Sequence, residues 1–256
     1  MQLKNKVFII TGAASGFGEA LSQEVVRKGA KVVLADINVE NGKKVAEELN
    51  KDNNKNAVFT KCDTAKHKDI VNLFVIAEKE FGGVDVSRAI SESVVVNNAG
   101  IGGIGIFYDQ TESWKKTIDV NLTGVIEGTQ LAIPYLKKRG GGVIINTASM
   151  SGLYPLKTSP VYAATKHGII GFTRSLSHLE RESHIRVNAV APFFSPTALL
   201  APLRAHSDYQ TMFKGFGVVS VEDVVKAMVH CVENDTLYGD VITILPNNPL
   251  GILPKI

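Results

Sequence analysis

The residue types best suited to chemistry in this chain are a serine, a tyrosine and a lysine near its middle: Ser149, Tyr162 and Lys166. Tyr162 and Lys166 stand four residues apart, a spacing that places both side chains on one face of a helix. There the lysine ammonium would lower the pKa of the phenol, because a nearby positive charge favours the phenolate. A serine hydroxyl beside the pair would hydrogen-bond a substrate oxygen. Any helix can hold such a pair, so the rest of the chain decides whether it is a site.

The elements that must position these residues alternate between short β-branched runs and longer amphipathic stretches. We expect strands at 7–10, 31–35, 57–61, 93–96, 143–146, 186–190 and 241–245. We expect helices from the glycines at 16 and 18 to about 28, then at 39–50, 67–81, 112–138, 160–181 and 221–232, with a kink at Pro134. Strands that are apolar on both faces and alternate with helices predict an α/β fold with a parallel sheet covered on both sides. No domain boundary is visible, so we expect one domain over 1–256 with an irregular loop at about 191–220.

Composition argues against several classes of protein. A net charge of +3 is small for 256 residues and gives no reason to expect a nucleic-acid partner. Two cysteines, Cys62 and Cys231, can build neither a disulfide framework nor a four-ligand zinc site, so we expect no metal. Residues 1–6 are unlike a signal peptide, and no apolar run reaches the ~20 residues of a membrane helix. We therefore expect a soluble cytoplasmic protein without a membrane partner.

The turn after the first expected strand, Thr11–Gly18, carries glycines at positions 12, 16 and 18. Glycines there let the backbone approach a pyrophosphate, which the following helix N-terminus attracts. The alternative is a glycine-rich turn without a ligand. Asp36 ends the second expected strand about 20 residues further on, where it would accept hydrogen bonds from ribose hydroxyls and repel a 2′-phosphate. Because no Arg or Lys occupies 13–17 or 37–38, NAD is favoured over NADP, although an Asp at this position can also simply begin a turn.

Cys62 and Asp63 follow the third expected strand. Asp63 would accept a hydrogen bond from the adenine amino group. The alternative, that Asp63 is the N-cap of the next helix, is nearly as well supported.

Five motifs in register now resemble the short-chain dehydrogenase/reductase family. They are Thr-Gly-x-x-x-Gly-x-Gly at 11–18, Asn97-Asn98-Ala99-Gly100, Asn121, Ser149 and Tyr162-x-x-x-Lys166. The resemblance extends from about residue 6 to 245, and each motif alone is weak. It implies a three-layer Rossmann fold with a doubly wound, seven-stranded parallel sheet. The residues 160–162, 166–169, 171–175, Thr197, Ala198 and Leu200 resemble the 15-hydroxyprostaglandin dehydrogenase (NAD) branch.

The resemblance assigns roles to these residues. Tyr162 would be the acid/base, Lys166 would lower its pKa and hold the nicotinamide ribose, and Ser149 would orient the substrate oxygen. Asn121 would hold a water that links Lys166 to solvent, although as a single residue it would more often be structural. Thr197 would contact the nicotinamide amide.

Two neighbouring side chains compete for roles in the site. Ser151 is a rival to Ser149, but Ser149 has the family's spacing to the tyrosine. His167 follows the lysine directly but faces another side of the helix than Tyr162, so we interpret it as structural.

Two further sets complete the predicted site. The cofactor set comprises Gly12, Ser15, Gly16, Phe17, Gly18, Asp36, Ile37, Cys62, Asp63, Thr64, Asn98, Ala99, Gly100, Tyr162, Lys166, Pro192, Ser195 and Thr197. The substrate set comprises Ser149, Ser159, Tyr162, Phe193 and Phe194.

The chain departs from the family pattern in four places. The stretch 83–93 is about eight residues longer than the family's link, and we expect it to loop out at the sheet end opposite the site. Phe193 replaces the family's Gly after Pro192.

The segment 199–220 is short for a substrate cover but rich in large apolar residues, which favours an apolar substrate. Ordinary packing of a short helix is an equal alternative. The ending 245–250 replaces the family's Asp-Gly-Gly, which favours a homodimer built from the helices at 112–138 and 160–181 over a tetramer.

Together these features predict an NAD-dependent dehydrogenase that interconverts a secondary alcohol and a ketone. The alternatives are a biosynthetic ketoreductase acting on a bulky natural product, which Asp36 disfavours, and an NAD-binding protein without turnover. The intact set of Ser149, Tyr162, Lys166 and Asn121 disfavours the second alternative.

Overall fold

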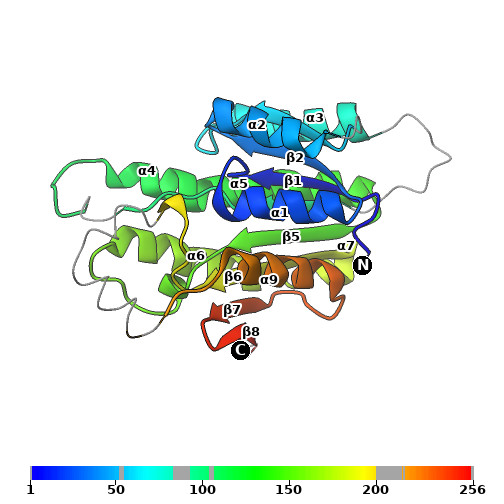
Figure 1. The fold of residues 1–256 in the computed structure, drawn as a ribbon. Coiled ribbons are helices and arrows are strands. Elements are labelled where there is room, and N and C mark those ends of the chain that lie inside the picture. Colours follow the sequence, from blue (N-terminus) through cyan, green and yellow to red (C-terminus); the bar gives the residue numbers. More distant parts are fainter. Residues whose placement is uncertain are drawn as a thin grey trace.

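All the strands of the computed structural model join one sheet, in the order β3-β2-β1-β4-β5-β6-β7-β8 (Figure 1). The structure describes residues 2–51, 55–82, 93–103, 107–199, 215 and 217–254. The strands are β1 Val7–Thr11, β2 Lys31–Asp36, β3 Ala57–Lys61, β4 Ser93–Asn97, β5 Gly142–Thr147, β6 Ile185–Pro192, β7 Val241–Leu245 and β8 Asn248–Ile252. The first seven pair in parallel, as predicted, because β-branched runs buried on both faces are typical of covered parallel sheets.

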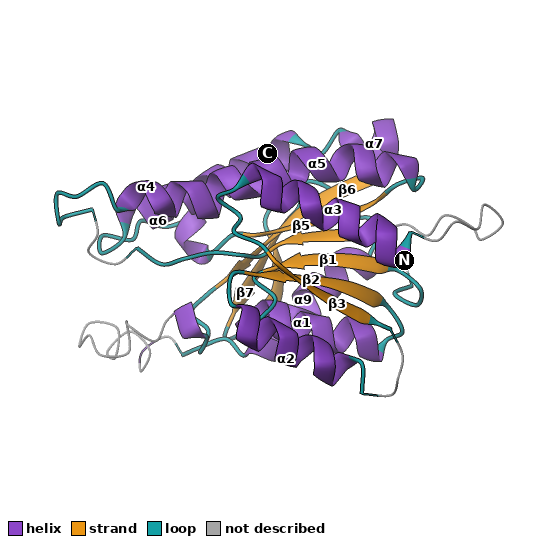
Figure 2. Cartoon of the chain, turned by 90° about the horizontal axis from the view of Figure 1, so that it is seen from above, coloured by secondary structure: helices purple, strands orange, loops and turns teal. Residues whose placement is uncertain are grey.

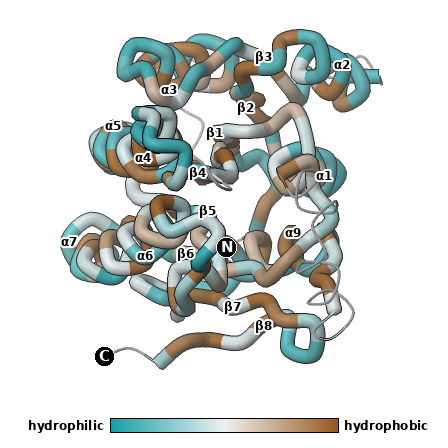
Figure 3. The backbone as a smooth tube through the Cα atoms, turned by 90° about the vertical axis from the view of Figure 1, so that its left-hand side faces the viewer, coloured by the Kyte–Doolittle hydropathy of each residue, from teal (hydrophilic) through white to brown (hydrophobic). Residues whose placement is uncertain are grey.

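Helices cover both faces of the sheet, which gives three layers (Figure 2). They are α1 Gly16–Arg27, α2 Val39–Leu49, α3 His67–Phe81, α4 Trp114–Ile118, α5 Gly124–Lys138, α6 Pro160–Ser175, α7 Leu179–Ser183 and α9 Val221–Glu233. Apolar side chains of α1, α2 and α9 pack on one face, and those of α3, α5, α6 and α7 pack on the other. Figure 3 shows hydrophobic stretches along the strands and in the helices that cover them. The predicted α/β class and Rossmann architecture are therefore correct.

The strand count differs from the predicted seven. An eighth strand, β8, pairs antiparallel with β7 through a short turn. Its residues are largely exposed, so the apolar-run criterion that found the other strands did not identify it.

The expected helix 112–138 is interrupted. It begins at Trp114, and a π-helical turn, η1 Asp119–Thr123, separates α4 from α5. α5 continues through Pro134, so the proline does not end the helix, and the predicted kink there stays a prediction. The break in the expected helix lies at η1. The expected helix 160–181 likewise ends at Ser175 and is followed by the separate turn of α7.

The carboxyl ends of the parallel strands meet at one edge of the sheet, at the left in Figure 1. β1 lies between β2 and β4, so the chain order reverses beside β1. In open α/β sheets, ligands bind outside the carboxyl ends of the strands at such a switch point. The segment 83–92 and most of 200–216, on which two of the predictions rest, lie outside the described residues.

Candidate active site

Tyr162 and Lys166 lie on α6, one turn apart, as their spacing predicts. Lys166 is 4% exposed, and its Nζ donates a 2.6 Å hydrogen bond to the backbone oxygen of Thr147 at the end of β5. The same Nζ lies 5.5 Å from the centroid of the Tyr162 ring. The Tyr162 hydroxyl is within hydrogen-bonding reach of the Ser149 side chain. The fold therefore brings together the three residues on which the predicted chemistry depends.

Burial governs the protonation of the pair. It raises the pKa of the Tyr162 phenol, and the hydrogen bond with Ser149 only partly opposes this. It also lowers the pKa of Lys166 to about 8. On balance the pKa of Tyr162 is therefore raised, because removal from water disfavours the phenolate, and the lowering effect of the Lys166 charge stays a prediction.

Ser149 is placed by a short 3-10 turn, η2 Met150–Gly152, for which it is the N-cap. Its Oγ accepts a 3.1 Å hydrogen bond from the backbone N–H of Ser151. A Cβ added to Gly152 would lie 2.6 Å from the backbone oxygen of Lys166, so only a glycine lets η2 pack this closely on α6. Ser151, the alternative candidate, thus stabilises the position of the Ser149 side chain through its backbone N–H.

Asn121 lies in the π turn and is fully buried. Its Nδ2 donates to the backbone oxygen of Ile101 at 2.9 Å, and its Oδ1 accepts from the Ile101 N–H at 2.8 Å. A Cβ on Gly100 would lie 3.4 Å from Asn121 Oδ1 and 3.9 Å from Lys166 Nζ, so the asparagine and the lysine flank one glycine. The side-chain amide thus fixes the segment after β4, and its predicted role of holding a water stays a prediction.

The glycine turn between β1 and α1 has the geometry of a cradle. Gly12 and Gly16 adopt positive φ angles of 66° and 57°, which glycine tolerates best. A Cβ on Gly18 would overlap the backbone oxygen of Gly12. Ser15 is the N-cap of α1 but makes no side-chain capping bond, and the neighbouring Phe17 packs against the core. The first N–H groups of α1 thus carry the partial positive charge that attracts a phosphate.

Asp36 ends β2 and turns its carboxylate toward this cradle. Its Oδ2 accepts a 2.9 Å hydrogen bond from the Ala14 N–H, and its Oδ1 accepts from the Asn38 N–H at 2.8 Å. Each oxygen has a further lone pair for a ribose hydroxyl. The neighbouring Ile37 is 58% exposed, an apolar surface beside the predicted adenosine position.

Asp63 is held in a tight turn after β3. Its Oδ1 accepts from the Ala65 N–H at 3.1 Å, and its Oδ2 lies 3.7 Å from Lys66 Nζ. The N-cap of α3 is Lys66, so the alternative reading of Asp63 as that N-cap is wrong. The preceding Cys62 is buried, and burial raises the pKa of its thiol to about 12, so it contributes to the site only through its backbone and shape.

Asn98 connects three segments through its side chain. Its Nδ2 donates to the backbone oxygens of Thr11 (3.0 Å) and Gly12 (3.2 Å), and its Oδ1 accepts from Thr147 Oγ1 at 3.3 Å. Thr11 Oγ1 in turn accepts from the N–H groups of Asn98 and Ala99. Asn98 and Ala99 belong to the predicted cofactor set, whereas the side chains of Thr11 and Thr147 have no role predicted from the sequence. The feature of the sequence that could have indicated this role is a threonine hydroxyl at the end of a buried strand, which Thr11 and Thr147 share.

The segment after β6 begins with aromatic packing. Pro192 ends the strand, and the Phe193 N–H donates to the Ile244 oxygen at 2.9 Å. The Phe193 and Phe194 rings meet edge to face, with centroids 4.9 Å apart. Phe193 also contacts two of the hydrophobic clusters, which gives this replacement of the family's glycine a packing role.

Ser195 and Thr197 return this segment to the cradle. A Cβ on Gly16 would lie 3.4 Å from Thr197 Cγ2. Ser195 is 3% exposed, and its Oγ finds no hydrogen-bond partner among the described residues. A buried hydroxyl without a partner is costly unless a ligand or water satisfies it.

These features fit a dinucleotide. The close packing of the cradle leaves no room for side chains at Gly12 and Gly18. The Ser15 side chain makes no capping hydrogen bond to the N-terminus of α1, so these N–H groups are open to a ligand. The Ser195 Oγ, which has no partner among the described residues, lies in the segment whose Thr197 contacts the cradle. An acidic residue stands where a ribose reader is expected. The donor set therefore suits a pyrophosphate flanked by two ribosides.

Two predicted neighbours of the site have ordinary structural surroundings. Ser159, which was assigned to the substrate set, is the buried N-cap of α6, and the first residue of that helix is Pro160. His167 is exposed, and its Nδ1 lies 2.9 Å from the Ala163 backbone oxygen of its own helix. The structural interpretation of His167 therefore fits.

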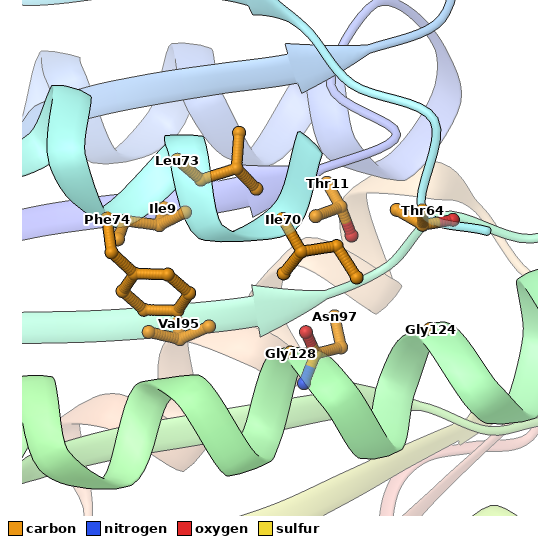
Figure 4. A pocket seen from close by; sticks show the side chains of 10 residues that line it. All are labelled: Ile9, Thr11, Thr64, Ile70, Leu73, Phe74, Val95, Asn97, Gly124 and Gly128. Carbon is orange, nitrogen blue, oxygen red and sulfur yellow. The ribbon is translucent and has the colours of Figure 1, made fainter. Parts of the chain in front are cut away.

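A small cavity lies behind the cradle, between α3, α5, β1 and β4 (Figure 4). Its lining is mainly apolar, with polar side chains from Thr11, Thr64 and Asn97. A Cβ on Gly124 would lie 2.6 Å from the Thr64 backbone oxygen, which shows how closely α5 approaches. None of the four predicted catalytic residues, Asn121, Ser149, Tyr162 and Lys166, lines this cavity, so we do not assign it to the reaction.

Comparisons with known proteins agree with this geometry. The model of the family described as "short chain dehydrogenase" matches residues 6–208. The chain is 33% identical over 260 residues to 15-hydroxyprostaglandin dehydrogenase [NAD(+)] of Mus musculus, covering 95% of this chain and 91% of that protein. It is 32% identical to a mitochondrial borneol dehydrogenase of Lavandula x intermedia over 259 residues, covering 98% and 93%. A short-chain dehydrogenase/reductase from Mycobacterium marinum superposes with a TM-score of 0.83 at 26% identity, covering 94% of each chain.

Proposed function

Because the chain belongs to the short-chain dehydrogenase family, we propose that it transfers a hydride between NAD and a secondary alcohol or ketone. The observation that carries the proposal is the convergence of Ser149, Tyr162 and Lys166 at the carboxyl edge of the sheet, beside the glycine cradle. The names of the mouse and lavender relatives, which describe dehydrogenases of hydroxyl compounds, support the same chemistry.

The side chains divide the proton chemistry between them. In the oxidative direction the Tyr162 oxygen accepts the hydroxyl proton, while the Ser149 hydroxyl holds the same substrate oxygen in place. Bound NAD supplies the acceptor for the hydride, so alcohol and NAD become ketone, NADH and one proton. Lys166, whose Nζ lies 5.5 Å from the ring centroid, places a positive charge beside the Tyr162 phenol, which favours the phenolate that accepts this proton.

NAD rather than NADP is supported by Asp36. Its carboxylate is fixed by Ala14 and Asn38, so it cannot swing away from a 2′-phosphate without breaking two hydrogen bonds. The printed name of the mouse relative, which includes NAD(+), supports this choice.

An apolar substrate is supported by the side chains after β6 and near the loop before α4. Phe193 and Phe194 are half-buried, whereas Phe107, Tyr108, Tyr154 and Leu199 are exposed large hydrophobic residues. Tyr108 donates to the Lys157 backbone oxygen at 2.9 Å, which joins the loop before α4 to the loop that leads from Ser149 to α6. Substrates with apolar bodies would bury such surface.

The test is a screen of secondary alcohols and ketones with NAD and with NADP, followed by NADH or NADPH absorbance. Turnover of alcohols with NAD, lost in Tyr162→Phe, is the expected result. Preferred reduction of ketones with NADPH would instead support the biosynthetic ketoreductase. NAD binding by calorimetry without turnover of any compound would support the non-catalytic alternative.

A homodimer through 112–138 and 160–181 and a cytoplasmic location remain predictions of the sequence. Among the described residues no helix is long and apolar enough to cross a membrane. Light scattering coupled to size exclusion would test the dimer, for which a mass near twice 27.6 kDa is expected.

A further inference from the structure

The backbone oxygen that receives Lys166 belongs to a residue tied to the cofactor cradle. Lys166 Nζ donates to the Thr147 oxygen at 2.6 Å, and Thr147 Oγ1 donates to Asn98 Oδ1 at 3.3 Å. Asn98 Nδ2 then donates to the Gly12 oxygen at 3.2 Å. Three hydrogen bonds thus connect the ammonium group to the turn predicted to hold the pyrophosphate.

The Lys166–Thr147 end of this chain of bonds is shielded from water, whereas its bonds to Asn98 are partly buried. Lys166 is 4% exposed and Thr147 is 7% exposed. Hydrogen bonds are electrostatically stronger in such surroundings, and an ammonium without an acceptor there would be costly. The position of the Thr147 carbonyl therefore helps to determine where Lys166 holds its charge.

A second, parallel set of bonds holds the helix itself. Asn97 Nδ2 donates to Asn146 Oδ1 at 2.9 Å, and Asn146 Nδ2 donates to Thr173 Oγ1 on α6 at 3.0 Å. The Ala148 N–H, in the same peptide plane as the Thr147 carbonyl, donates to the Val190 oxygen at 2.8 Å. These bonds do not involve the Thr147 hydroxyl, so its removal should leave α6 and the sheet in place.

We propose that Thr147 is a positioning residue: its hydroxyl couples the cofactor cradle to the carbonyl that fixes the ammonium of Lys166. The inference rests on the proposed function, because it concerns how the same site orients its lysine. It assigns a role to a side chain outside the Ser149, Tyr162, Lys166 and Asn121 set. It also implies that the cradle and the proton-transfer pair are linked through Asn98.

The test uses Thr147→Val, which removes the hydroxyl and keeps the branched shape, and Thr147→Ser, which restores the hydroxyl. The matched control is Thr243→Val, because Thr243 is also a buried strand threonine, 6% exposed, whose hydroxyl donates to the Gly251 oxygen at 3.1 Å and makes no bond to the cradle. It lies in β7, two strands from β5. The ionisation of the tyrosines in each variant is followed with pH by near-ultraviolet absorbance. The same titration is repeated on that variant with Tyr162→Phe added, and the difference between the two curves is the signal of the Tyr162 phenolate. The titration needs no turnover.

In Thr147→Val the less firmly held ammonium should raise the Tyr162 titration midpoint, and with it the midpoint of the pH–rate profile for alcohol oxidation. Misplacement of a catalytic group by ~1 Å can lower the rate by about 100-fold. The Thr147 carbonyl would lose only part of its support in Thr147→Val, so kcat should fall by about tenfold. KM for NAD should stay within about twofold, because the Gly12 and Thr11 contacts of Asn98 remain. Thr147→Ser should recover both midpoints.

An unchanged midpoint and kcat in Thr147→Val would overturn the proposal. So would equal losses in Thr147→Val and Thr243→Val that follow their thermal stabilities, since these would show a merely structural role. If wild type oxidises no alcohol, the proposed function fails, while the phenolate titration still decides whether Thr147 positions Lys166.

Discussion

The two halves of the carboxyl edge are built by different means. On the cradle side, Asn98 bonds to Thr11, Gly12 and Thr147, and Asp36 bonds to Ala14. After β6, the side chains of the described residues meet mainly through the two phenylalanine rings, and the Ser195 hydroxyl has no partner among those residues. The side chains of the first half are held by directional hydrogen bonds, whereas those of the second meet through apolar contact that tolerates changes of shape. Backbone bonds, such as that from the Phe193 N–H to the Ile244 oxygen, hold the main chain of the second half.

This difference separates two requirements. Hydride and proton transfer need groups held in one geometry, because small displacements are costly in rate. Choice of substrate needs a surface whose shape can vary while the chemistry is kept. We therefore expect substitutions on the cradle side to change turnover or cofactor choice, and substitutions after β6 to change which alcohol is accepted.

The largest expected effect is that of Tyr162→Phe, which removes the proton acceptor and keeps the ring. Loss of a general acid/base should lower kcat by about 100-fold to 10,000-fold. NAD affinity, measured by calorimetry, should change little, because the cradle contacts lie on other elements. Retained turnover would refute the acid/base role, and Tyr154→Phe, at an exposed tyrosine, is the matched control.

Much of this architecture could be predicted from the sequence, because buried strands and glycine positions follow from local patterns. The motif spacing likewise identified the family and placed Ser149, Tyr162 and Lys166 together. The π turn at Asn121 could not be predicted, because a helical pattern does not reveal one extra residue in a turn. The direction of the Tyr162 pKa shift was missed because it depends on burial in three dimensions, and a spacing of four residues reports only proximity.

The next expected effect concerns Asp36 and tests whether the cradle side reads the cofactor. Asp36→Asn keeps an oxygen to accept one backbone hydrogen bond but removes the charge that repels a 2′-phosphate. The ratio of kcat/KM for NAD to that for NADP should fall by about tenfold or more, equivalent to about 1.4 kcal/mol. Glu40→Gln, on the exposed first turn of α2, is the control for a nearby charge. An unchanged ratio in Asp36→Asn would contradict the ribose-reading role.

A smaller effect is expected after β6. Phe194→Ala removes one ring of the edge-to-face pair, and kcat/KM for a bulky apolar secondary alcohol should fall by about threefold to tenfold, the range for a few lost apolar contacts. Oxidation of 2-propanol should be nearly unchanged, because so small a substrate has little surface to bury. Equal losses for both alcohols would mean that the ring supports the catalytic geometry. The distinction between the two halves of the edge would then fail.

The last expected effect leaves turnover aside and concerns the change in stability with pH. Burial lowers the pKa of Lys166 to about 8, whereas an unfolded lysine titrates near 10.4. Between these values the unfolded chain binds more protons than the folded chain, so the free energy of unfolding should rise with pH through this window, by at most about 1.4 kcal/mol per unit. The raised pKa of Tyr162 acts in the opposite direction only above the ordinary tyrosine range near 10. Urea unfolding of Lys166→Met should lose this rise between about pH 8 and 10, whereas Lys157→Met, at an exposed lysine, should keep it. If both variants keep the rise, Lys166 retains its charge in the folded protein, and the bond to the Thr147 carbonyl compensates for its burial more fully than its lowered pKa implies.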